Sequence, residues 1–78
     1  MRNLEMFDIF AIKQLAKKVG AQYYEGMGDP HIYIDNRQVM KTKKGGYDLW
    51  KKNRIHLKFV KPDATEAEAA RWLIFGDL

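Results

Sequence analysis

The first part of the chain places apolar residues on one face of a helix. Between residues 8 and 20 they recur every three or four positions, as expected for one helical face, at Ile9, Ile12, Leu15, Ala16 and Val19. Gly20 suits the position just after a helix end, and Lys17 and Lys18 suit the negative end of the helix dipole. The pattern predicts an amphipathic helix over residues 8–20.

The middle of the chain changes to short segments typical of strands. Four segments are rich in β-branched and aromatic residues: 22–25, 31–35, 38–43 and 54–61. Turn-forming residues separate them at 26–30, 35–37 and 44–46. Residues 47–50 fit either a strand or a short helical turn. Because short connections favour the pairing of sequence neighbours, this part predicts three or four antiparallel strands.

A second helical pattern occupies residues 62–76. Four alanines precede the apolar cluster at residues 72–75, and Gly76 stops the pattern. Two capping-box registers overlap at its start: Asp63 with Glu66, and Thr65 with Glu68. This segment predicts a second, short helix packed closely on the sheet.

Together these segments predict an α+β fold in a single small domain over residues 1–78. The order is helix, three or four antiparallel strands, helix. Two helices can cover only one face of such a sheet, so we expect both on the same face. With the alternation of the strands as assigned, the other face carries His31, Tyr33, His56 and Lys58.

Length and composition favour a binding protein over an enzyme. A chain of 78 residues and 9.2 kDa leaves little room for a deep active-site cleft. The absence of cysteine excludes disulfides, thiol nucleophiles and zinc ribbons, and the absence of serine excludes a serine nucleophile. We therefore expect no catalytic residue, no metal and no cofactor.

Composition also bears on location. Small secreted domains usually carry disulfides, so a chain without cysteine is expected in the cytoplasm. No apolar run approaches the ~20 residues that a membrane span needs, so we expect no membrane partner.

The two histidines raise a metal or acid–base alternative. His31 and His56 could share a face, with Asp29 or Asp35 nearby. The spacing of these residues matches no ligand motif, so the sequence favours surface or hydrogen-bonded histidines instead.

Positive charge is concentrated between residues 37 and 61. This segment holds nine basic side chains and one acidic one, whereas the chain as a whole carries a net charge of only +4. Like charges at this density repel one another and cost stability. An anionic partner would remove that cost.

The basic segment predicts a small nucleic-acid-binding module that contacts mainly the phosphate backbone of DNA or RNA. Lysine and arginine contact phosphates and release counterions, and exposed aromatic rings stack on unpaired bases. Tyr33 is a further candidate for stacking. The predicted binding residues are Arg37, Lys41, Lys43, Lys44, Tyr47, Trp50, Lys51, Lys52, Arg54 and Lys58.

A protein partner is the alternative. The chain would then be a small inhibitor or adaptor, of the kind that mobile elements and phages encode. Its basic face would dock on an acidic surface of a larger, nucleic-acid-processing complex, with Trp50 or Tyr47 as the hot spot. A homodimer is a variant of this hypothesis, since the acidic segment 62–78 could meet the basic one across a two-fold axis. The sequence leaves the choice between these partners open.

Overall fold

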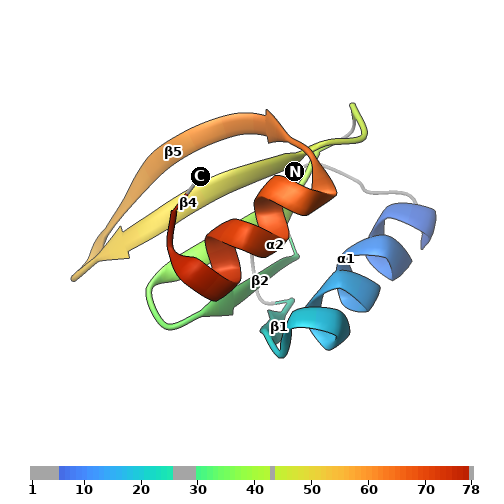
Figure 1. Ribbon diagram of the computed structural model, residues 1–78, viewed down its shortest axis with the longest axis horizontal. Helices are drawn as coiled ribbons and strands as arrows, with labels where there is room; N and C mark the ends of the chain where they lie inside the picture. The colour runs from blue at the N-terminus through green and yellow to red at the C-terminus, as the bar shows by residue number, and fades with distance from the viewer. Residues whose placement is uncertain (1–5, 26–29, 43, 78) are drawn as a thin grey trace.

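The computed structural model describes residues 6–25, 30–42 and 44–77, and these form two helices and one sheet (Figure 1). In chain order the elements are α1 (Met6–Val19), β1 (Gln22–Tyr24), β2 (His31–Ile34), β3 (Arg37–Lys41), β4 (Tyr47–Asn53), β5 (His56–Ala64) and α2 (Glu66–Phe75). The predicted α+β class and the order helix, sheet, helix are confirmed. The predicted number of strands is wrong, because the described residues form five.

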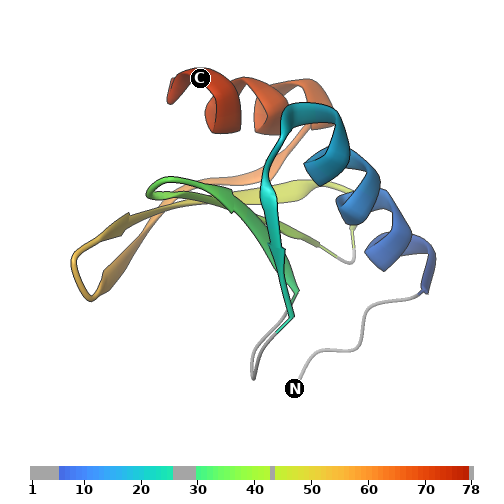
Figure 2. The same cartoon turned by 90° about the horizontal axis from the view of Figure 1, so that it is seen from below.

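The five strands form an antiparallel meander. Their order in the sheet is β1-β2-β3-β4-β5, so every strand pairs with its neighbour in sequence. Both helices lie against the same face of the sheet, as predicted (Figure 2). No described element covers the opposite face, which we call the open face.

The core lies between the helices and the sheet. Ile32, Val39 and Leu49 stand opposite one another on β2, β3 and β4, and all three are completely buried. The two helices cover this row with Ile12, Leu15, Ala16, Ala69, Trp72 and Leu73. Because side chains alternate along a strand, the residues beside this row point to the open face.

Helix α2 begins later than the pattern predicts, because residues 62–64 remain in β5. Of the two candidate capping boxes, the structure forms the one between Thr65 and Glu68. The Thr65 Oγ1 accepts a hydrogen bond from the Glu68 backbone N–H at 3.1 Å. The Glu68 Oε1 accepts one from the Thr65 backbone N–H at 2.9 Å. This box fixes the point at which the chain leaves the sheet.

The capping box predicts a dependence of stability on pH. The Thr65 backbone N–H holds the pKa of the Glu68 carboxyl below its ordinary value, and Lys61, with its Nζ at 3.7 Å, acts in the same direction. A carboxyl whose pKa is lowered in the folded protein stabilises it above the unfolded pKa, about 4.3 for Glu. That contribution is lost as the pH falls through the folded pKa.

We expect Glu68→Gln to flatten the fall in unfolding free energy below about pH 4.3. Urea unfolding at a series of acid pH values measures this pH dependence of the unfolding free energy. Glu66→Gln is the control, since it removes the same charge from the same turn without touching the capping box. If the unfolding free energy of Glu68→Gln fell as steeply at acid pH as that of the wild type, the role of the capping box would be contradicted.

A β-bulge reverses the predicted facing of β5. Leu49 pairs with Lys61 and Trp50 pairs with Phe59, so Val60 is an extra residue on β5. This extra residue puts the Phe59 side chain on the same side as Trp50, which is the open face.

The bulge decides which predicted residues share the open face. His31 and Tyr33 lie there, as predicted, because they flank the buried Ile32. The same prediction for His56 and Lys58 is wrong, since Leu57 and Phe59 take their place. Alternation alone could not reveal one extra residue in a strand.

Candidate functional site

The β4–β5 hairpin extends beyond the part of the sheet that the helices cover. Figure 2 shows its turn projecting away from both α1 and α2. We call residues 51–59 the arm. All nine are exposed, in contrast to Tyr47 and Leu49 at the start of β4, which are buried. The side chains of the arm are therefore available to a partner.

The arm carries four cations and no acidic residue: Lys51, Lys52, Arg54 and Lys58. Lys51 and Lys58 pair directly across the two strands. Like charges at directly opposite positions destabilise a sheet. The arm therefore has a charge arrangement that weakens the free protein and that an anion would neutralise.

A basic hollow lies at the base of the arm. It has a volume of about 360 Å³ and is lined by Asn36, Lys51, Lys52, Asn53 and Lys58. The Lys52 backbone N–H donates to the Asn36 carbonyl oxygen at 2.7 Å, which holds the β2–β3 turn beside the arm. Ammonium and amide groups are hydrogen-bond donors, so the lining suits an anion with several acceptor oxygens, such as a phosphate.

Aromatic rings gather on the open face. One row across the strands runs from Tyr33 through Gln38 and Trp50 to Phe59. The rings of Trp50 and Phe59 meet edge to face, with centroids 4.8 Å apart. This contact places Trp50 on the open face at the point where the arm begins.

A second group of rings lies on the β1 side of the open face. The ring centroids of Tyr24 and His31 are 5.2 Å apart, and those of His31 and Tyr33 are 6.1 Å apart. We call the five rings of Tyr24, His31, Tyr33, Trp50 and Phe59 the aromatic face. A hollow of about 430 Å³ opens here, lined by Tyr24, His31, Tyr33, Asp35, Gln38 and Lys52. Lys52 borders both hollows, so the aromatic face and the basic hollow adjoin.

Comparison with known proteins gives no functional assignment. No protein-family model matches the chain, and no curated protein or solved structure matches it significantly.

The structure brings together only part of the predicted binding residues. Trp50 and the four cations of the arm lie in one region. Lys44 is exposed in the turn between β3 and β4, at the other end of β4. Seven strand residues separate the two ends by roughly 20 Å, so Lys44 does not belong to the arm. Lys43 lies outside the described residues.

Three other predicted residues lie on the covered face of the sheet. Arg37 donates from Nε and Nη2 to the Leu73 carbonyl oxygen of α2, at 3.2 and 2.8 Å. The Lys41 Nζ lies 5.1 Å from the centroid of the Tyr47 ring, and these two residues are only 5% and 3% exposed. These contacts assign Arg37, Lys41 and Tyr47 a role in the fold, away from the arm and the open face.

The metal alternative gains no support from the geometry. His31 lies on the open face, whereas His56 points to the other side of the arm. Asp29 lies outside the described residues. Within residues 6–25, 30–42 and 44–77, no three His, Asp or Glu side chains are grouped to hold a metal ion.

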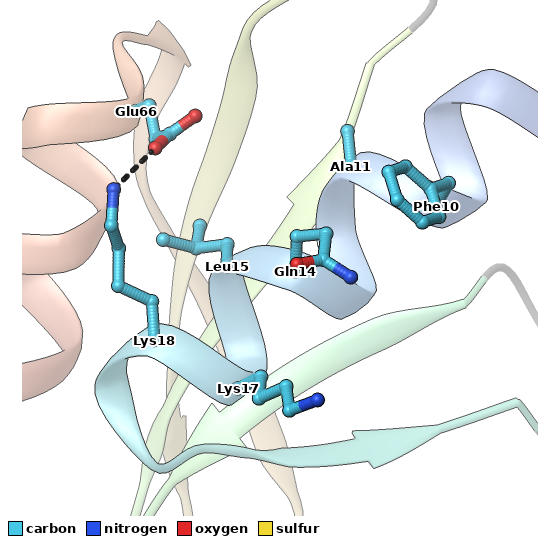
Figure 3. Close-up of a pocket in the computed structure, with 7 residues that line it drawn as sticks. All are labelled: Phe10, Ala11, Gln14, Leu15, Lys17, Lys18 and Glu66. Atoms are coloured by element: carbon cyan, nitrogen blue, oxygen red, sulfur yellow. Dashed lines mark hydrogen bonds and ion pairs between the residues drawn. The ribbon is translucent and has the colours of Figure 1, made fainter.

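Another hollow lies between α1 and the start of α2 (Figure 3). Its volume is about 510 Å³, and the Lys18 Nζ forms an ion pair with the Glu66 Oε2 at 3.3 Å across one side of it. Because this cation is already paired, we place the candidate site on the arm and the open face. Neither α1 nor α2 is long and apolar enough to cross a membrane.

Sequence reasoning missed two members of the aromatic face, Tyr24 and Phe59. Tyr24 could have been found, since Tyr23 and Tyr24 are adjacent strand residues and must face opposite sides. Phe59 could not, because the bulge at Val60 sets its direction.

Proposed function

We propose that this protein is a nucleic-acid-binding module, and not an enzyme, that holds phosphates with the arm and stacks bases on the aromatic face. One observation carries the proposal. A projecting arm with four cations and no acidic residue adjoins an uncovered sheet face bearing five rings. Nucleic acids combine the two chemistries that these surfaces complement, a charged backbone and flat apolar bases.

The phosphate contacts would supply most of the affinity. Lys51, Lys52 and Lys58 border the basic hollow, and Arg54 lies farther along the arm. Four phosphate contacts give a slope of the logarithm of affinity against the logarithm of salt of about −3. The relief of the Lys51–Lys58 repulsion adds to the gain on binding.

Stacking would add the second contribution. The Trp50 side chain lies on the open face and packs against the Phe59 ring, with the two ring centroids 4.8 Å apart. Stacking of a base on an aromatic side chain contributes ~1–3 kcal/mol. Because every base has a π-face, this contribution gives little sequence specificity.

Tryptophan fluorescence tests the proposal. Short single- and double-stranded DNA and RNA are titrated into the protein at low and high salt. Trp72 is 6% exposed and lies in the core, so a change in emission reports on Trp50. We expect quenching that weakens steeply with salt. Trp50→Phe should lose the quenching but still bind a labelled oligonucleotide, as fluorescence anisotropy would show.

The absence of any binding at low salt would reject the proposal. The acidic-protein alternative would then take its place. It would use the same cations, and the half-exposed side chains of Leu57 and Phe59 would supply its apolar contact. Pull-down with the arm intact and with Lys58→Glu would test it.

A further inference from the structure

Two residues form the tip of the arm. Asn53 and His56 are the last pair of the hairpin, so the turn between them consists of Arg54 and Ile55 alone. The Arg54 φ is 59°, in the left-handed region. The Ile55 side chain is 90% exposed.

Arg54 does not suit this turn on conformational grounds, and Ile55 does not suit it on grounds of exposure. Two-residue hairpin loops favour glycine, asparagine or aspartate where φ is positive. The same sheet follows this rule in its other two-residue turn, where Asp35 has a φ of 54° and Asn36 follows. At the tip of the arm, an arginine occupies the strained position and an isoleucine is placed in water. These two departures at adjacent positions point to a contact that the free protein does not make.

We propose that Ile55 is a wedge that inserts between neighbouring bases of a nucleic-acid double helix. Apolar side chains such as isoleucine unstack and kink a duplex when they enter a base step. A two-stranded β-ribbon fits a groove of a duplex. This inference rests on the proposed nucleic-acid binding and names the form of nucleic acid that the arm enters.

The distribution of charge on the arm supports a duplex. Lys51 and Lys58 point to one side of the ribbon, whereas Lys52, which pairs with Leu57, points to the other. A ribbon inserted in a groove has a phosphate backbone on each side. Cations on both sides can therefore hold both backbones while the tip reaches the bases.

The test uses Ile55→Asn, which removes the apolar tip and keeps all four cations. Asparagine is tolerated in a turn, so thermal unfolding should show a folded protein at least as stable as the wild type. Ile74→Asn is the matched control, because Ile74 is 49% exposed on α2. The probe is a DNA duplex with 2-aminopurine beside a flexible TA step, compared with a duplex built on a stiff A-tract.

The wild type and Ile74→Asn should raise the 2-aminopurine fluorescence and bind the TA duplex more tightly than the A-tract duplex. Ile55→Asn should lose the fluorescence rise, and its affinity for the TA duplex should fall roughly tenfold, as expected from the burial of one isoleucine. Binding of the wild type without a fluorescence rise would overturn the wedge and leave nucleic-acid binding standing, as would equal behaviour of Ile55→Asn. No binding of the wild type to any nucleic acid would overturn both.

Discussion

Replacing Lys51 and Lys58 together by glutamate is expected to lower nucleic-acid affinity at least 100-fold at moderate salt, because each reversal removes a phosphate contact and adds a repulsion. The net charge of the arm falls from four positive to zero. We therefore expect the salt dependence of binding to nearly vanish. Anisotropy of a labelled oligonucleotide at several salt concentrations measures both effects.

The unfolding free energies of Lys58→Glu and of the double variant show whether a loss of affinity is caused by a loss of folding. Lys51 and Lys58 face each other, so Lys58→Glu alone converts a repulsive pair into an attractive one. We expect it to raise the free energy of unfolding by about 0.5 kcal/mol while lowering affinity. The double variant restores a like-charge pair at these two positions, but its new glutamate at position 51 also faces Arg37 on β3, so its stability should stay at or above that of the wild type. Loss of binding with rising stability is a result that damage to the fold cannot produce.

Lys17→Glu is the control for Lys58→Glu. Lys17 is exposed on α1, on the covered side of the sheet, and its reversal changes the net charge of the protein by the same amount. If affinity depends on the arm, Lys17→Glu binds almost as the wild type does. Equal losses for the two variants would show that only the total charge matters and would reject the arm as the binding surface.

Both helices and the turns at 35–36 and 44–46 were predictable because local sequence determines them. The turn at Arg54 and Ile55 was not, because the alternation of residues 54–61 predicted a strand there. The apolar period of residues 8–20 indicated α1, and Asp35 with Asn36 marked a turn that the structure contains. The end of β5 was not predictable in the same way. Residues 62–64 carry helix-start signals, yet they complete the edge strand, where a proline lacking an N–H group is tolerated.

The candidate site was predictable only as a region of charge. Arg37 and Lys52 are both basic strand residues, and nothing in their neighbours distinguishes their roles. The structure separates them, because the partner of Arg37 is a carbonyl oxygen 36 residues away in α2. Long-range contacts of this kind determine which cations bond to other parts of the fold and which stay available to a ligand.

Replacing Arg37 by methionine is therefore expected to destabilise the fold. The last turn of α2 has no basic residue of its own, so Arg37 supplies the positive charge that its C-terminal carbonyls favour. Methionine keeps the aliphatic stem and removes both hydrogen bonds to Leu73. Hydrogen bonds to a charged group contribute about 1.5–3 kcal/mol, so we expect a fall of about 2 kcal/mol in the free energy of unfolding. For a domain of this size the melting temperature should fall by about 10 °C.

Lys52→Met is the matched variant on the open face. It removes the same charge from an exposed side chain, so its stability should stay within about 0.5 kcal/mol of the wild type. Its affinity for nucleic acid should fall several-fold, whereas that of folded Arg37→Met should change less than twofold. Removing the cation from β3 would thus lower stability, as urea unfolding measures, whereas removing the cation from β4 would lower the affinity for an oligonucleotide. If Arg37→Met kept its stability and lost affinity as Lys52→Met does, Arg37 would belong to the binding surface and its contact with α2 would carry no weight in the fold.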